Sequence, residues 1–259
     1  MAHDPHDPHD RCEGWEALAD WGRDAELLEP LTGGAANQVR SVRVGGRLAV
    51  ARLGSRTDAD LAWETGLVLH LDRALGGAGL ALPVPVPTAD GRLFSRGLVV
   101  MTRVEGEPPQ AEADWRRVAG AVRRVHAATH GWPQRPWWRS STDLLTAERG
   151  TRTDLTAMPA EGVRRCRAAW ARLAGRPVCV VHGDLNPGNI RLTAQRVGLI
   201  DWDESRVDVP ELDLALPHDA ADLGPDALDA AAQASAAWEA AVCWDDDYAR
   251  SRLAEVRSP

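Results

Sequence analysis

The sequence predicts an α+β protein with a strand-rich N-terminal part and a larger, mainly helical C-terminal part. Two alternating apolar runs, 39–44 and 48–53, flank Gly45 and Gly46, a pattern typical of two strands joined by a tight turn. From Trp115 onward, apolar residues recur instead at the three- and four-residue spacing of amphipathic helices. The expected parts are a tail with a short helix (1–30), a strand-rich part (31–105) and a helical part (106–259).

The composition is that of a globular protein. Hydrophobic residues make up 44% of the 259 residues, which is enough for a substantial core and excludes wholesale disorder. The net charge of −8 argues against nucleic acid as the main partner and favours a cationic small molecule. Four scattered cysteines without CxxC spacing indicate neither a disulfide framework nor a zinc site. Because no apolar run reaches spanning length and the N-terminus lacks an apolar leader, we expect a cytosolic protein without a membrane partner.

The N-terminal part is expected to follow a simple order of elements. A His-Asp-Pro repeat over 1–10 is typical of a terminal segment without fixed structure. Residues 15–21 are expected to form a short amphipathic helix or turn. Beyond the hairpin, apolar residues at helical spacing predict a helix over 58–75, and a buried strand over 98–101 ends in a polar loop.

The C-terminal part is expected to contain three main helices. The first begins near Trp115, the second covers 161–173, and the third extends over the alanine-rich stretch 225–256. A loop over 131–139 carries a group of tryptophans, which either line a ligand pocket or pack the loop onto the protein. The sequence leaves both readings open for Trp132, Trp137 and Trp138.

The most informative stretch is a polar loop between two short apolar strands, 178–181 and 197–200. The loop holds Asp184 and, five residues later, Asn189, and the second strand is followed by Asp201. Magnesium-dependent phosphoryl transfer needs such a set. One carboxylate accepts the proton of the attacking hydroxyl, while an amide oxygen and a second carboxylate hold the metal. The Asn-Pro-Gly turn within the loop lets the first two side chains point into one cleft.

The motif HGDxxxxN from His182 to Asn189, followed by IDW at 200–202, resembles the catalytic and metal-binding loops of the aminoglycoside phosphotransferase family. That family shares the protein-kinase fold. The resemblance therefore implies a bilobal α+β protein with a small β-rich N-lobe and a larger, mainly helical C-lobe. It also implies transfer of the γ-phosphoryl group of ATP or GTP to a hydroxyl of a small molecule. Asp184 would be the catalytic base, and Asn189 and Asp201 would hold Mg²⁺.

The resemblance further implies a nucleotide-binding site in the N-terminal part. Two glycines would cover the phosphates, a glutamate would orient the arginine that grips them, and the loop after residue 101 would bind the base. The residues implied are Gly33, Gly34, Asn37, Arg52, Glu64, Met101, Thr102 and Val104. Without the resemblance, these residues indicate only a turn, an exposed strand arginine, a solvated helix face and a loop.

Two positions depart from the family's pattern. Ala36 stands where a serine is common, and Arg52 stands where kinases carry a lysine. All 30 basic residues of this chain are arginine, and the guanidinium fork binds phosphate well. The second departure is therefore compatible with nucleotide binding.

Other polar residues are expected to support the site. By resemblance, His182 braces the catalytic loop, and Asp213 braces that loop, caps a helix, or does both. His126 is expected to flank the helical core. Six aspartates either form an anionic wall for a polycationic substrate or lie on a solvated face: Asp219, Asp222, Asp226, Asp245, Asp246 and Asp247.

The sequence leaves the acceptor open. An antibiotic-modifying kinase is the leading interpretation, favoured by the acidic C-terminal part. A metabolic kinase for choline, homoserine or a sugar-like alcohol is the second. A nucleotide-binding pseudokinase is a third, for which the presence of Asp184, Asn189 and Asp201 leaves little support. A glycosyltransferase with Asp201-Trp202-Asp203 as its DxD metal motif would leave the HGD motif unexplained.

Overall fold

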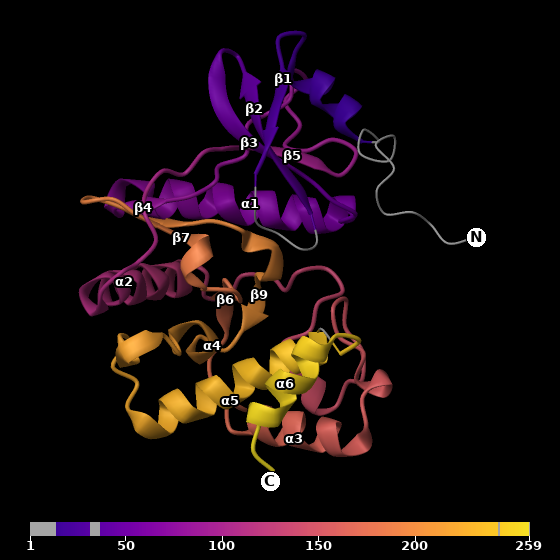
Figure 1. Cartoon of the computed structure of the whole chain (residues 1–259), viewed down its shortest axis with the longest axis vertical. Coiled ribbons are helices and arrows are strands. Elements are labelled where there is room, and N and C mark those ends of the chain that lie inside the picture. The colour runs from indigo at the N-terminus through magenta and orange to yellow at the C-terminus, as the bar shows by residue number, and fades with distance from the viewer. Residues whose placement is uncertain (1–13, 32–36, 243, 259) are drawn as a thin grey trace. The chain divides into compact units, whose positions relative to one another are not determined.

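The computed structural model describes residues 14–31, 37–242 and 244–258. The chain divides into two compact units (Figure 1): unit 1 is Met1–Gly77 with Ala81–Glu105, and unit 2 is Ala78–Leu80 with Gly106–Pro259. None of the helices in the described ranges combines the length and the apolar character that a membrane crossing requires.

Unit 1 contains a four-stranded antiparallel sheet. Its order is β1 (Glu26–Pro30), β2 (Gln38–Val44), β3 (Arg47–Leu53) and β5 (Leu98–Thr102). Strands β2 and β3 form the predicted hairpin, whose two turn glycines, Gly45 and Gly46, have φ values of 54° and 75°. Such positive φ values are what a two-residue hairpin turn requires. Strand β1 was not predicted, because its sequence lacks clean alternation and ends in a proline.

The core of unit 1 forms between this sheet and the 3-10 helix η1 (Trp15–Trp21), where a short helix or turn was expected. Helix α1 (Asp58–Leu75) has the predicted bounds, and Thr57 caps it by accepting a hydrogen bond from the Asp60 N–H at 3.2 Å. The apolar stripe of α1 is buried, and Glu64 is buried with it. This burial needs a partner for the carboxylate, which is described below. A single turn, η2 (Gly76–Ala78), follows α1.

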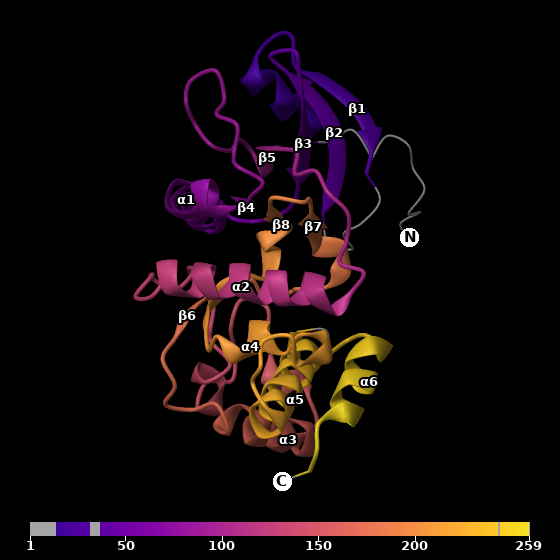
Figure 2. The ribbon, with the colours of Figure 1, turned by 90° about the vertical axis from the view of Figure 1, so that its left-hand side faces the viewer.

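Unit 2 is mainly helical. Its helices are α2 (Glu112–Ala128), α3 (Ala160–Ala171), α4 (Glu211–Leu214), α5 (Pro225–Val242) and α6 (Asp247–Glu255). Figure 2 shows α5 and α6 side by side, and their apolar faces share one core that includes Trp170 and Trp238. The prediction of a single helix over 225–256 was wrong. Asp246 interrupts it because its carboxylate accepts a hydrogen bond from the Tyr248 N–H at 3.0 Å and so starts a new helix.

Short strands in unit 2 hold the polar loops in place. Strand β6 (Cys179–Val181) pairs with β9 (Arg206–Asp208), and β7 (Ile190–Leu192) pairs with β8 (Val197–Leu199), which also neighbours β4 (Leu80–Ala81). Single 3-10 turns complete the described structure: η3 (Asp143–Leu145), η4 (Leu155–Ala157), η5 (Pro187–Asn189), η6 (Trp202–Glu204) and η7 (Pro217–Asp219). The loops β6–β7 and β8–β9 therefore each begin and end on a paired strand.

Candidate active site

Asp184 and Asn189 lie together in the β6–β7 loop. The amide nitrogen of Asn189 donates to the carboxylate of Asp184 at 2.8 Å and to its backbone carbonyl at 3.0 Å. Asn186 donates to the other carboxylate oxygen of Asp184 at 2.8 Å, and its own oxygen accepts from the Gly188 N–H at 2.7 Å. Asp184 is half-buried, so its carboxylate is fixed in direction but still reachable. This geometry suits a base that must meet a substrate hydroxyl.

Asp201 is joined to the same loop through the backbone. The Ile200 N–H donates to the Asn189 carbonyl at 3.0 Å, which places the two loops side by side. Asp201 has φ 61° and ψ 72°, a left-handed conformation that is uncommon for a residue with a side chain. Sparsely populated backbone conformations of this kind occur often at functional sites, because the surrounding structure must hold them.

The donor set of these loops fits a hard divalent cation. Because the nitrogen of Asn189 makes both donations to Asp184, its amide oxygen is the atom left for a cation, and Asp201 supplies a carboxylate. Magnesium in phosphoryl-transfer sites takes one or two protein oxygens and completes its shell with phosphate and water. Within the described ranges, no group of three or more His, Cys, Asp or Glu is suited to hold a metal ion.

Asp213, in α4, holds the start of the β6–β7 loop through its carboxylate. Its carboxylate accepts hydrogen bonds from the N–H groups of His182 at 2.7 Å and Gly183 at 2.9 Å, and it faces His126 Nε2 at 3.0 Å. Burial by itself raises the pKa of Asp213, yet the hydrogen bond and charge of His126, together with His182 and Gly183, hold this pKa below its usual value of 3.8. Of the two predicted roles, Asp213 therefore has that of a loop brace, whereas Pro210 occupies the N-cap of α4.

His182 is buried and links the two loops. Its Nε2 lies 2.9 Å from the Ile200 carbonyl, so this nitrogen carries the proton, and Nδ1 accepts from the Asp184 N–H at 3.3 Å. Its ring packs on Trp202 with the ring centroids 4.8 Å apart. Both ring nitrogens are thus used within the protein, which is the bracing arrangement expected from the sequence.

Gly183 allows this loop to pass close to the segment after Asp201. Its φ is +83°, and a Cβ atom there would lie 2.6 Å from the Glu204 carbonyl oxygen and 2.9 Å from a nitrogen of Arg206. Gly183→Ala is expected to lower the free energy of unfolding by about 2–4 kcal/mol, since left-handed strain and a backbone clash add. Urea-induced unfolding followed by tryptophan fluorescence measures this loss.

Gly175→Ala provides the control, because Gly175 has φ +78° and nothing within 4 Å of an added Cβ. It should lose only the conformational part, about 1–2 kcal/mol. Equal losses in the two variants would show that the close approach at Gly183 has no energetic weight.

Arg52 and Glu64, predicted as a pair, are in contact within unit 1. A guanidinium nitrogen of Arg52 on β3 lies 2.6 Å from a carboxylate oxygen of Glu64 on α1. Their side chains are only 7% and 4% exposed, so neither charge is solvated enough to be stable without a partner. The solvated-surface readings of these two residues are therefore wrong.

The other predicted nucleotide residues occupy the ends of strands in unit 1. Asn37 immediately precedes β2, Met101 and Thr102 end β5, and Val104 follows in the loop. The Thr102 hydroxyl accepts from the Val84 N–H at 2.9 Å, which ties the end of β5 to the extended segment before it. Gly33, Gly34, Ala36 and the His-Asp-Pro repeat lie outside the described residues.

With this geometry established, comparison with known proteins identifies the family. The model of the family described as "Phosphotransferase enzyme family" matches residues 27–253. The chain belongs to this family. The HGD motif, Asn189, Asp201 and the Arg52–Glu64 pair all lie within the matched region.

Two curated phosphotransferases show how widely acceptors vary among relatives. The chain is 30% identical to a homoserine kinase of Rhizobium meliloti over 162 residues, covering 55% of this chain and 47% of that protein. It is 29% identical to viomycin phosphotransferase of Streptomyces vinaceus over 208 residues, covering 69% of both. The match thus spans about half the length of the first of these relatives.

Solved structures agree in fold. A thermostable mutant of aminoglycoside phosphotransferase APH(4)-Ia, crystallised with AMP-PNP and hygromycin B, superposes with a TM-score of 0.61 at 18% identity. The match covers 93% of this chain and 95% of that one. At this identity the likeness concerns the fold alone, and it confirms the predicted protein-kinase-like α+β class.

The tryptophan-rich loop of this phosphotransferase separates into two environments. Trp138 is buried in the core of unit 2, Trp132 is half-buried, and Trp137 is 83% exposed. Packing of the loop onto the protein therefore explains Trp138 but not Trp137.

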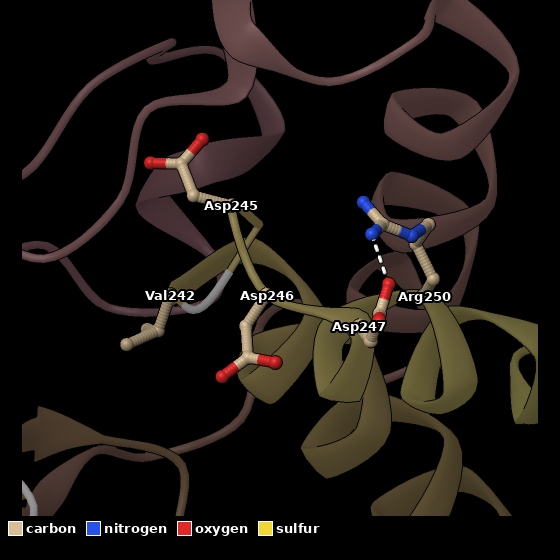
Figure 3. Close-up of a pocket in the computed structure, with 5 residues that line it drawn as sticks. All are labelled: Val242, Asp245, Asp246, Asp247 and Arg250. Carbon is tan, nitrogen blue, oxygen red and sulfur yellow. Dashed lines mark hydrogen bonds and ion pairs between the residues drawn. The ribbon is translucent and has the colours of Figure 1, made fainter.

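The six predicted wall aspartates do not form one patch. Asp226 lies in the first turn of α5, whereas Asp245, Asp246 and Asp247 follow its last turn. An 18-residue helix is about 27 Å long, so the two groups are well apart. The three later aspartates line a pocket of about 580 Å³ with Val242 and Arg250, and Asp247 pairs with Arg250 (Figure 3).

Sequence reasoning missed a buried ionic network behind the site. Asp208 accepts hydrogen bonds from the Ser141 N–H at 2.8 Å, from its hydroxyl at 2.7 Å and from Arg206 Nε at 2.9 Å. The Arg206 guanidinium lies over the ring of Trp238 at 3.5 Å. A charged residue within the apolar run 207–209 was the available signal, since an isolated carboxylate is not buried without partners.

Proposed function

We propose that this phosphotransferase moves the γ-phosphoryl group of ATP or GTP to a hydroxyl group of a small molecule. The observation that supports this most directly is the fixed Asp184 carboxylate, held by Asn189 in a loop that is backbone-bonded to the Asp201 loop. An arrangement of one oriented carboxylate beside two oxygen ligands matches the requirements of hydroxyl activation at a metal-bound phosphate.

In the proposed reaction, Asp184 orients the acceptor hydroxyl and takes its proton. The hydroxyl oxygen bonds to the γ-phosphorus as the bond between that phosphorus and the β–γ bridging oxygen breaks, and the nucleoside diphosphate leaves. Asn189 and Asp201 would hold Mg²⁺, which when bound neutralises charge on the phosphates. Catalysis rests mainly on positioning and charge neutralisation.

Within unit 1, we assign the nucleotide to the residues named above. Arg52, oriented by its 2.6 Å contact with Glu64, is proposed to grip the α- and β-phosphates, with Gly33, Gly34 and Asn37 covering them. The Thr102 carbonyl and the Val104 N–H are proposed to bind the base beside Met101. A guanidinium group suits this role because it binds phosphate oxygens in a bidentate manner.

For the acceptor, we favour an antibiotic with cationic character. The chain carries a net charge of −8, and of the two relatives above, viomycin phosphotransferase is matched over the larger share of both chains. A metabolic kinase is the second candidate, favoured by the similarity to homoserine kinases. The two candidates predict different acceptors for the same loops.

The test is magnesium-dependent ATP and GTP consumption by purified protein. The panel comprises viomycin, hygromycin B and other aminoglycosides, choline and homoserine, and mass spectrometry identifies the phosphorylated product. Turnover with the antibiotics alone supports the first candidate, and turnover with homoserine or choline supports the second. Tight nucleotide binding without any turnover across the panel would favour a pseudokinase and would contradict the proposal.

A further inference from the structure

The segment after Asp201 directs several backbone carbonyls toward one point. The left-handed Asp201 is followed by the single turn η6, and the chain then enters β9 at Arg206. Within this segment the Trp202 carbonyl accepts hydrogen bonds from the N–H of Ser205 at 3.1 Å and from its hydroxyl at 2.5 Å. The carbonyls of Asp203 and Ser205, and more weakly that of Trp202, accept from a single guanidinium group, that of Arg135.

Arg135 comes from the tryptophan-rich loop and is 1% exposed. One of its terminal nitrogens donates to the carbonyls of Asp203 at 3.0 Å and Ser205 at 3.1 Å, and more weakly to that of Trp202 at 3.5 Å. The guanidinium also lies over the ring of Trp138, 4.8 Å from its centroid. Burying an arginine is costly, and these carbonyl dipoles and the aromatic face offset that cost.

The neighbouring Gln134 fixes the register between the two segments. Its amide donates to the Val207 carbonyl at 2.8 Å and accepts from the Val207 N–H at 2.9 Å. The same oxygen accepts from the Arg135 N–H at 2.8 Å. Residues 134–135 are therefore hydrogen-bonded to the segment 202–207 at several points. A displacement of this segment would break the bonds of Gln134 and those of Arg135 together.

We infer that Arg135 is a positioning residue for the metal ligand Asp201. The inference rests on the proposed function, because it concerns how Asp201 holds Mg²⁺. A left-handed aspartate persists only where its surroundings hold it, and Arg135 binds the three carbonyls that follow within four residues. Loss of the guanidinium should release the backbone around Asp201 from this conformation, and so weaken metal binding while the Asp201 carboxylate is still present.

The chemistry requires arginine rather than any cation. One nitrogen of the guanidinium donates to the carbonyls while the planar group lies over Trp138. A lysine ammonium can donate to the carbonyls but has no planar group to lie over the ring at the same time. Arg135→Lys therefore keeps the buried charge and loses the geometry. Arg135→Met removes the charge as well.

The test measures metal affinity directly, without turnover. Mn²⁺ replaces Mg²⁺, and electron paramagnetic resonance follows free Mn²⁺ during titration of the full chain with AMP-PNP present. We expect Mn²⁺ to bind roughly 10- to 100-fold more weakly in Arg135→Lys, the range found when a partner of a metal ligand is removed, and at least as weakly in Arg135→Met. The affinity for ADP in EDTA should stay at the wild-type value in both.

Arg167→Lys is the matched control. Arg167 also donates to two backbone carbonyls of unit 2, those of Leu144 at 3.1 Å and Ala147 at 3.2 Å, away from the Asp201 loop. The Arg167→Lys substitution should leave Mn²⁺ affinity unchanged, although it also removes guanidinium hydrogen bonds to two carbonyls.

Wild-type Mn²⁺ affinity in folded Arg135→Lys and Arg135→Met would overturn the inference. A loss of ADP affinity in parallel with the loss of Mn²⁺ affinity would also overturn it, by showing a general structural role. A wild-type protein that binds no Mn²⁺·AMP-PNP would instead refute the proposed function, and the role of Arg135 with it.

Discussion

Replacing Asp184 with alanine is expected to lower kcat for phosphoryl transfer by a factor of about 10³, within the range for loss of a positioned base. The carboxylate is the group proposed to take the hydroxyl proton, and its bonds to Asn186 and Asn189 give it a fixed direction. Nucleotide affinity should remain close to that of the wild type, because binding of the phosphates is assigned to other residues. Steady-state kinetics with the best acceptor of the panel, together with ADP titration, measure both quantities.

Asp229→Ala is the control for this substitution. Asp229, in α5, also binds two partners, Arg172 at 2.8 Å and Arg257 at 2.7 Å, but it belongs to no proposed part of the site. It should retain full activity. Near-complete transfer by Asp184→Ala would remove this carboxylate from the mechanism.

Replacing Asp213 with alanine is expected to lower the free energy of unfolding by roughly 3–5 kcal/mol, the range for removing a buried carboxylate from its hydrogen-bonded partners. The substitution leaves His126 and the N–H groups of His182 and Gly183 without their shared acceptor. Because those N–H groups belong to the loop that carries Asp184, the proposed base, kcat should fall as well. Asp213→Asn keeps one acceptor oxygen and should lose less of the free energy of unfolding. This variant replaces the alanine variant in the measurements if the latter does not fold.

The effect of Asp213 should also depend on pH in a defined direction. Its pKa in the folded protein lies below the ordinary 3.8, so the ionised group stabilises the fold above that value. This contribution is lost as pH falls through 3.8 toward the folded-state pKa. Urea unfolding at several pH values should therefore show the gap between wild type and Asp213→Ala narrowing below about pH 4. A gap that widens there would contradict the direction of the pKa shift.

Local patterns predicted those parts of the fold that depend on local chemistry. The Gly45-Gly46 hairpin and the bounds of helix 58–75 follow from turn geometry and apolar spacing. The break within 225–256 could not be predicted in this way, because the helical pattern of the sequence continues through Asp246. Only the hydrogen bond by which Asp246 caps the second helix shows where that helix begins. Strand 206–208 was missed because its charged residues are buried by partners distant in sequence.

The candidate site was predictable to a similar extent. The spacing of Asp184, Asn189 and Asp201 was sufficient to group them, since all three lie in two loops at strand ends. The contribution of Arg135 was not visible, because an arginine among prolines and tryptophans carries no signal of its depth. Its role depends on a contact across 67–70 residues of sequence, which no local pattern encodes.

The buried Arg52–Glu64 pair has a practical consequence for chemical labelling. Reagents that mark kinases by acylating the amine on the corresponding strand need a lysine, and a guanidinium group stays protonated and unreactive under those conditions. Because every basic residue of the chain is arginine, such a reagent finds no side-chain amine elsewhere either. The proposed nucleotide region therefore offers no side-chain amine to amine-directed electrophiles, and an Arg52→Lys variant would supply the single lysine for them to acylate.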